Sequence, residues 1–99
     1  MDKWTIEDWQ REQAAEQLAA FYLYTPMCGT CAVASKMLLV IEALRPDLPM
    51  GKADLNYVEQ LAVEYEIESV PCLLIHRAGQ PIEKIYAFQS VPYLLDRLS

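Results

Sequence analysis

The short apolar run Ala19–Tyr24 constrains the fold of this chain more than any other stretch. It carries no charge, is rich in aromatic residues and stops at Thr25-Pro26. A short run that is apolar at successive positions is typical of a strand buried on both faces of a sheet. We therefore predict that this run is the central strand of the fold.

The order of the other elements favours a mixed sheet. Apolar positions recur at helical intervals on both sides of the run, and Thr5 is placed to cap the first helix. A turn at 78–81 separates two short segments that read as antiparallel strands. We expect a short leading strand near 3–5, helices over 6–17, 29–44, 57–65 and 91–98, and strands over 50–55, 72–75 and 82–86. Alternating elements followed by a hairpin indicate a mixed sheet with helices on both faces.

Length, composition and charge narrow the classes of function. The 99 residues fit one domain, 1–99, and 54% of them are hydrophobic, which argues against disorder. The apolar runs are far shorter than the ~20 residues needed to cross a bilayer. The chain also starts with acidic residues where a secretory signal has positive charge. Because this start does not resemble an export signal and three cysteines are too few for a disulfide-stapled secreted scaffold, we expect a cytoplasmic protein. A net charge of −6 disfavours nucleic acid and anionic membranes as partners.

Cys28 and Cys31 form a Cys-x-x-Cys pair where the apolar strand ends and the predicted helix 29–44 begins. Residues three apart on a helix share a face, with Cβ atoms ~5–6 Å apart, close to what a disulfide spans. At a helix start, unpaired N–H groups and the positive end of the helix dipole favour a thiolate. We expect Cys28 to be the nucleophile and Cys31, one turn inside, to be the thiol that resolves a mixed disulfide.

Other interpretations of this pair stay open at this point. An isolated Cys-x-x-Cys is as often a structural or metal-binding feature as a redox centre. A structural zinc site wants four ligands, and Cys72 and His76 would lie ~13 Å apart along one strand, so they cannot complete it together. Two chains could still share a metal or an iron–sulfur cluster through four cysteines. The strand–loop–helix setting favours redox chemistry without a metal or any cofactor beyond the Cys28–Cys31 disulfide.

Three segments of the chain together resemble the thioredoxin family. They are the aromatic strand Phe21–Tyr24, the segment Thr25-Pro26-Met27-Cys28-Gly29-Thr30-Cys31, and Ile67-Glu68-Ser69-Val70-Pro71 before the hairpin. The likeness covers nearly the whole chain in the family's order of elements. It implies an α/β thioredoxin fold, with a central mixed β-sheet of four to five strands flanked by helices on both faces. The activity it implies is exchange of the Cys28–Cys31 dithiol with protein disulfides.

The resemblance also implies which residues bind a substrate. In the family the proline matching Pro71 is cis and packs against the disulfide, and the residue before it, here Val70, offers backbone hydrogen bonds to a peptide. Without the resemblance, trans is the favoured state of an X-Pro bond. Met27, Gly29 and Thr30, around the cysteines, complete the expected site. Met27 and Thr30 stand where the family usually has tryptophan and proline.

The expected partners follow from the same resemblance. The chain would act as a monomer on protein disulfides, and a thioredoxin reductase or a low-molecular-weight thiol would reduce the pair again. The alternative belongs to another class of function. It is a non-catalytic thioredoxin-fold module that keeps the cysteines for redox-sensitive binding or redox sensing.

Four residues elsewhere invite functional interpretations that we consider weaker. Cys72 could be a third redox thiol or a glutathionylation target, but we prefer a small buried strand residue. His76, the single histidine, is expected at the far end of its strand from the cysteines, in a surface or hairpin role. Trp4 and Trp9 are expected to be packing residues.

Position 22 departs from the family in a way that bears on mechanism. The family's buried acid, six residues before the first cysteine, helps to deprotonate the resolving thiol, and Tyr22 stands in its place. Lys52 matches the lysine that accompanies this acid, and Asp54 follows it. A neutral phenol with an ordinary pKa near ~10 is a poor general base at neutral pH. We therefore hypothesise that water or a substrate group deprotonates Cys31.

Replacement of Tyr22 by Asp is then expected to raise the turnover rate, because a carboxylate can accept the proton of Cys31. Disulfide-reduction kinetics of the Tyr22→Asp variant, with circular dichroism to verify folding, measure the effect. An unchanged or lower rate in a folded variant contradicts the hypothesis.

Overall fold

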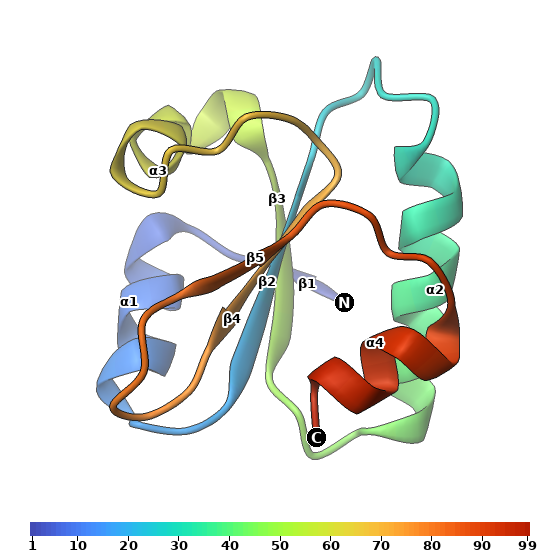
Figure 1. Ribbon diagram of the computed structural model, residues 1–99. Coiled ribbons are helices and arrows are strands. Elements are labelled where there is room, and N and C mark those ends of the chain that lie inside the picture. The colour runs from blue at the N-terminus through green and yellow to red at the C-terminus, as the bar shows by residue number, and fades with distance from the viewer.

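The computed structural model describes residues 1–99, and its centre is a five-stranded sheet in the order β1-β3-β2-β4-β5 (Figure 1). The strands are β1 (Asp2–Lys3), β2 (Ala19–Tyr24), β3 (Met50–Asp54), β4 (Cys72–His76) and β5 (Glu83–Ile85). Strands β1, β2 and β3 run parallel, β4 is antiparallel to β2, and β5 is antiparallel to β4. The predicted mixed sheet and its closing hairpin are confirmed.

Strand β2 is the centre of the sheet. It pairs with β3 from Ala20↔Met50 to Tyr24↔Asp54, and with β4 from Ala19↔His76 to Leu23↔Cys72. Every residue of 19–23 is at most 1% exposed, so the strand is buried on both faces as predicted. The chain leaves this strand at a fixed point, directly before the cysteine pair.

Helices cover both faces of the sheet (Figure 1). One face packs against α1 (Ile6–Ala14) and α3 (Glu59–Glu64), and the other against α2 (Cys31–Leu44) and α4 (Val91–Arg97). Along β2 the side chains alternate, so that Phe21 and Leu23 join one core cluster and Tyr22 joins the other. The sheet therefore separates two cores. No helix combines the length and the apolar character that a membrane span requires.

Helix α1 begins as predicted and ends early. The Thr5 side chain accepts the N–H of Asp8 (3.1 Å), and the Thr5 N–H donates to the Asp8 carboxylate (2.9 Å), which forms a capping box. The helix ends at Ala14 rather than at residue 17, because Glu16 takes a left-handed conformation (φ 53°) that turns the chain toward β2. No glycine or proline marks this end in the sequence.

The strand predicted over 50–55 ends at Asp54, and the helix predicted over 57–65 is wrong at its start. A 3-10 helix, η1 (Leu55–Tyr57), follows β3, and α3 starts only at Glu59. Val58 separates them with φ −134° and ψ 39°, outside the helical region, while its side chain is buried in the α1/α3 core. The buried Val58 thus interrupts the helix at a position that the apolar pattern of the sequence does not reveal.

Trp4 packs against Gly51 on the face of the sheet that α1 covers. Its ring lies over Gly51 and packs 5.6 Å from Phe21 and 6.4 Å from Trp9, measured between ring centroids. Trp4 and Trp9 are packing residues, as predicted. A Cβ atom at position 51 would overlap the Trp4 ring.

The Gly51→Ala variant is expected to lose about 1–3 kcal/mol of unfolding free energy, because the added methyl group forces Trp4 out of its place. Urea unfolding measures this loss. Gly29→Ala is the matched control, since nothing lies within 4 Å of a Cβ atom there. Equal stability of the two variants would show that Trp4 does not constrain the sheet.

Candidate active site

The cysteine pair lies in the turn between β2 and α2. The N–H of Cys28 donates to the Thr25 carbonyl (3.2 Å), and the N–H of Cys31 donates to the Cys28 carbonyl (3.3 Å). Helix α2 begins at Cys31, with Thr30 as its N-cap residue. The predicted helix 29–44 is therefore wrong at its start, and Cys28 lies just before the first turn instead of within it. Thr30 has a helical backbone but its side chain does not cap the helix.

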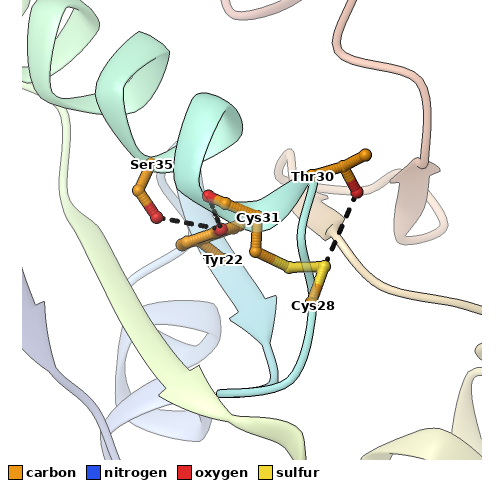
Figure 2. Close-up of a disulfide and its surroundings, with 5 residues drawn as sticks. All are labelled: Tyr22, Cys28, Thr30, Cys31 and Ser35. Atoms are coloured by element: carbon orange, nitrogen blue, oxygen red, sulfur yellow. Dashed lines mark hydrogen bonds between the residues drawn. A yellow bond between two sulfur atoms is a disulfide. The ribbon is translucent and has the colours of Figure 1, made fainter.

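Cys28 and Cys31 are joined by a disulfide, with Cα atoms 5.3 Å apart (Figure 2). The Thr30 hydroxyl lies 3.6 Å from Cys28 Sγ, and it is the donor because a disulfide sulfur carries no hydrogen. Cys31 is 5% exposed, whereas Cys28 is half-buried. The two cysteines thus differ in exposure, and Cys28 is the one that a partner molecule can approach more readily.

The structure brings only some of the predicted substrate-binding residues together. Met27 is 94% exposed, and Gly29 and Thr30 are also exposed. The Val70–Pro71 bond is cis, as the family resemblance implied. A hollow of about 370 Å³ next to the disulfide turn is lined by Thr30 and Pro71, whereas neither cysteine lines it, nor do Met27, Gly29 and Val70.

The remaining wall of this hollow consists of residues that the sequence did not single out. They come from α2 and from the segment between β5 and α4: Val33, Ala34, Met37, Tyr86, Ala87, Phe88 and Gln89. Most are apolar, so the hollow suits an apolar side chain of a partner. No signal in the sequence pointed to this wall, because Val33 and Met37 belong to the same apolar helical pattern as the core residues of α2.

Tyr22 is hydrogen-bonded to the first turn of α2 (Figure 2). Its hydroxyl donates to the Cys31 carbonyl (3.0 Å) and accepts a hydrogen bond from Ser35 Oγ (3.0 Å). Burial raises the pKa of the Tyr22 phenol above its ordinary value, although the Ser35 hydrogen bond acts in the opposite direction. Tyr22 is therefore uncharged at neutral pH, in keeping with the hypothesis that it is not the base for Cys31.

Cys72 and His76 occupy the two ends of β4. Cys72 is fully buried, and burial raises the pKa of its thiol to about 12, so it is the inert strand residue that we preferred. His76 pairs with Ala19 at the start of β2, far along the strand from the cysteines, as predicted. Of the predicted surface or hairpin roles, the surface role is wrong, because His76 is only 9% exposed, whereas His76 does lie in the hairpin, as the last residue of β4. Its Nδ1 lies 3.0 Å from the Gln17 carbonyl and its ring contacts Trp9 edge-on.

A larger hollow, of about 600 Å³, lies at the carboxyl ends of the parallel strands β1, β3 and β2. It contains neither cysteine, and Lys52 and Asp54 line it. The full lining is Lys3, Trp4, Thr5, Ile6, Glu7, Tyr24, Pro26, Lys52, Ala53, Asp54, Tyr57 and Val58. No group of three or more His, Cys, Asp or Glu side chains in the structure could hold a metal ion.

The sequence model of the Thioredoxin family matches residues 2–97 of the chain. The chain belongs to the thioredoxin family. It is 41% identical over 91 residues to the thioredoxin-like protein YusE of Bacillus subtilis (strain 168), covering 92% of this chain and 86% of that protein. It is 32% identical over 82 residues to the thioredoxin of Staphylococcus aureus, covering 78% of this chain and 73% of that one.

Solved structures of thioredoxins share the fold. Mitochondrial thioredoxin 3 from Saccharomyces cerevisiae in its oxidised form superimposes with a TM-score of 0.85 at 21% identity, over 99% of this chain and 92% of that one. Chloroplastic thioredoxin z gives a TM-score of 0.87 at 16% identity, over 99% and 90%. The predicted thioredoxin fold is confirmed. Family membership and a cysteine pair at disulfide distance together indicate thiol–disulfide oxidoreductase activity.

In the reduced thioredoxin-family protein, we expect iodoacetamide to alkylate Cys28 while Cys72 stays unmodified at neutral and mildly alkaline pH. Alkylation requires an accessible thiolate, and Cys72 is fully buried with a pKa of about 12. Mass spectrometry of native and guanidinium-unfolded samples measures the modification at each cysteine. Labelling of Cys72 in the native state at the rate of Cys28 would contradict this account.

Proposed function

We propose that the protein is a reductase of protein disulfides and that Cys28 and Cys31 are its catalytic residues. The observation that carries this proposal is the disulfide between a more exposed and a buried cysteine at the start of α2. Such a pair can exchange with a second disulfide through the more exposed cysteine and then close on itself. We propose that residues 1–99 do this as one domain and as a monomer.

The proposed cycle transfers two electrons. The Cys28 thiolate attacks a substrate disulfide, which forms a mixed disulfide and releases the first substrate sulfur as a thiolate that takes up a proton. The Cys31 thiol gives its proton to water or to a substrate group, and the resulting thiolate then attacks Cys28 Sγ. The Cys28–Cys31 disulfide forms, and the second substrate thiol leaves. A thioredoxin reductase or a low-molecular-weight thiol supplies two electrons to restore the dithiol.

The surroundings of Cys28 support its role as the nucleophile. It precedes the first turn of α2, where the helix dipole and unpaired N–H groups favour a negative charge. The hydroxyl of Thr30, 3.6 Å from Cys28 Sγ, is a hydrogen-bond donor that would further favour the thiolate over the thiol. Cys31 is too buried to meet a large substrate first.

The surface around Cys28 supports binding of an extended peptide. Met27, Gly29 and Thr30 present an exposed, uncharged rim, and Pro71 reaches the same hollow as Thr30. We propose that these four residues and the backbone of Val70 bind the segment that carries the substrate disulfide. The net charge of −6 favours neither nucleic acid nor anionic membranes as partners, and we propose a cytoplasmic setting.

The Cys28→Ser variant is expected to abolish reduction of insulin, because no thiolate remains to attack its disulfides. The Cys31→Ser variant is expected to stop after the first step and to accumulate a mixed disulfide, visible by non-reducing electrophoresis. Turbidity of precipitating insulin chains reports turnover. The matched control is Cys72→Ala, which removes the third thiol and leaves turnover near the parent value.

The same assay distinguishes the non-catalytic alternative. A parent protein that folds and forms its disulfide, yet reduces insulin no faster than Cys28→Ser, would be a redox-sensitive binding module. Proteins captured from a lysate by Cys31→Ser and released by dithiothreitol would then identify the physiological substrates of an active enzyme.

A further inference from the structure

We propose that Tyr22 and Ser35 are positioning residues that hold Cys31 ready to close the disulfide. The inference rests on the proposed function, since the position of Cys31 matters only if the pair cycles. Tyr22 hydrogen-bonds to the Cys31 carbonyl and Ser35 to Tyr22, and neither side chain hydrogen-bonds to a reacting sulfur atom (Figure 2). They would act on the chemistry through Cys31.

The hydrogen bonds join strand and helix in a closed ring. Cys31 is the first residue of α2, so its carbonyl accepts the N–H of Ser35 within the helix. The Tyr22 hydroxyl adds a second bond to that carbonyl (3.0 Å), and Ser35 Oγ donates back to the Tyr22 oxygen (3.0 Å). The central strand is thereby tied, by a side chain, to the turn that carries the resolving thiol.

This tie adds to the burial of Cys31 and to the backbone hydrogen bonds at the start of α2, where side chains otherwise give little support. The Thr30 side chain makes no capping hydrogen bond, and no acidic residue stands in the first turn. The Tyr22 ring, in contrast, is fixed. It is 1% exposed and packs 5.5 Å from the Tyr24 ring and 6.0 Å from the Phe88 ring. The hydroxyl cannot leave the Cys31 carbonyl unless this aromatic cluster repacks.

A phenol suits this role in a way that a carboxylate does not. An ionised carboxylate only accepts hydrogen bonds, so it cannot bond to a carbonyl oxygen, whereas a phenol can donate to one. Burial keeps the Tyr22 pKa above its ordinary value, so the donor persists over the pH range in which thiols react. Tyr22 therefore contributes a fixed hydrogen bond where the family has an acid. Because Tyr22→Asp would remove this bond and add a base at once, only Tyr22→Phe isolates positioning.

The step that depends on this position is the attack of Cys31 on the mixed disulfide. A bond forms between Cys31 Sγ and Cys28 Sγ, the bond between Cys28 Sγ and the substrate sulfur breaks, and the substrate leaves as a thiolate. The rate of such an intramolecular attack depends on how much of the time the two atoms are held in range. A looser first turn would slow closure and make the disulfide easier to reduce.

The Tyr22→Phe variant tests the proposal because it removes the hydroxyl and keeps the ring. Equilibration with glutathione buffers measures the reduction potential of the pair without any protein substrate. We expect disulfide formation to become less favourable by up to about fivefold, since one typical hydrogen bond sets the upper limit of the effect, which corresponds to a potential up to about 20 mV higher. The Ser35→Ala variant is expected to shift the potential in the same direction and by less.

Tyr65→Phe is the matched control for a lost tyrosine hydroxyl. Tyr65 accepts hydrogen bonds from Trp9 Nε1 (3.3 Å) and Gln13 Nε2 (3.5 Å) on the other face of the sheet. This variant is expected to lose stability and to keep the parent potential. If Tyr65→Phe and Tyr22→Phe shift the potential equally, the shift reflects a general loss of folding stability, and the proposal is overturned.

An unchanged potential in a folded Tyr22→Phe variant also overturns the proposal. If that variant does not fold, Ser35→Ala decides, since Ser35 is only half-buried and its loss leaves the aromatic cluster intact.

The pH profile of mixed-disulfide resolution separates positioning from proton transfer. Positioning lowers the rate of Tyr22→Phe evenly across pH, whereas a displaced profile would assign Tyr22 to proton transfer instead. Failure of insulin reduction in the parent, with a measurable potential, would reject the proposed function alone.

Discussion

Burial of β2 on both faces, together with its pairing to β3 and β4, is the constraint on which the rest of the structure depends. A strand held this way cannot shift its register without exposing apolar side chains or losing backbone hydrogen bonds. The point where the chain leaves β2 is therefore fixed, and Cys28 follows that point by only a few residues. The neighbouring strand β4 contributes to the site, since it begins directly after Pro71.

The site combines this rigid frame with a short and exposed turn. The frame contributes Cys31, the cis bond before Pro71 and the Tyr22 hydroxyl, all of which are held by packing or hydrogen bonds. The turn contributes Cys28, with the exposed Met27 before it. Thiol exchange requires both properties: the first sulfur must meet a variable partner, and the second must return to the same place in each cycle.

Much of the fold followed from local sequence patterns, and the exceptions have physical causes. The central strand and the Thr5 cap could be predicted because burial and capping leave direct traces in residue type. The end of α1 could not, because Glu16 adopts a left-handed conformation that is rare outside glycine. The start of α2 was placed too early because Thr30 is a plausible helix residue whose hydroxyl turns to Cys28 instead.

The candidate site was predictable where chemistry is local in the chain and not where it depends on tertiary contacts. The cysteine pair is a local motif, and the cis state of Pro71 came from the family resemblance rather than from spacing. The burial of His76 arises from Trp9 and from the carbonyl of Gln17, both remote in sequence. The apolar hollow next to the disulfide turn likewise joins α2 to the segment after β5, which no single stretch of sequence describes.

The sheet also separates two hydrophobic cores whose residues can vary independently of each other during evolution. Tyr22 and Phe88 belong to the α2/α4 core, next to the disulfide, whereas Trp9 and Phe21 belong to the α1/α3 core behind the sheet. Substitutions in the α1/α3 core, away from Cys72 beside Pro71, are expected to change stability more than they change the disulfide, because the sheet separates that core from α2. Many residues of the α1/α3 core could therefore be substituted during evolution, which would adjust the stability of the protein while its redox centre stays the same.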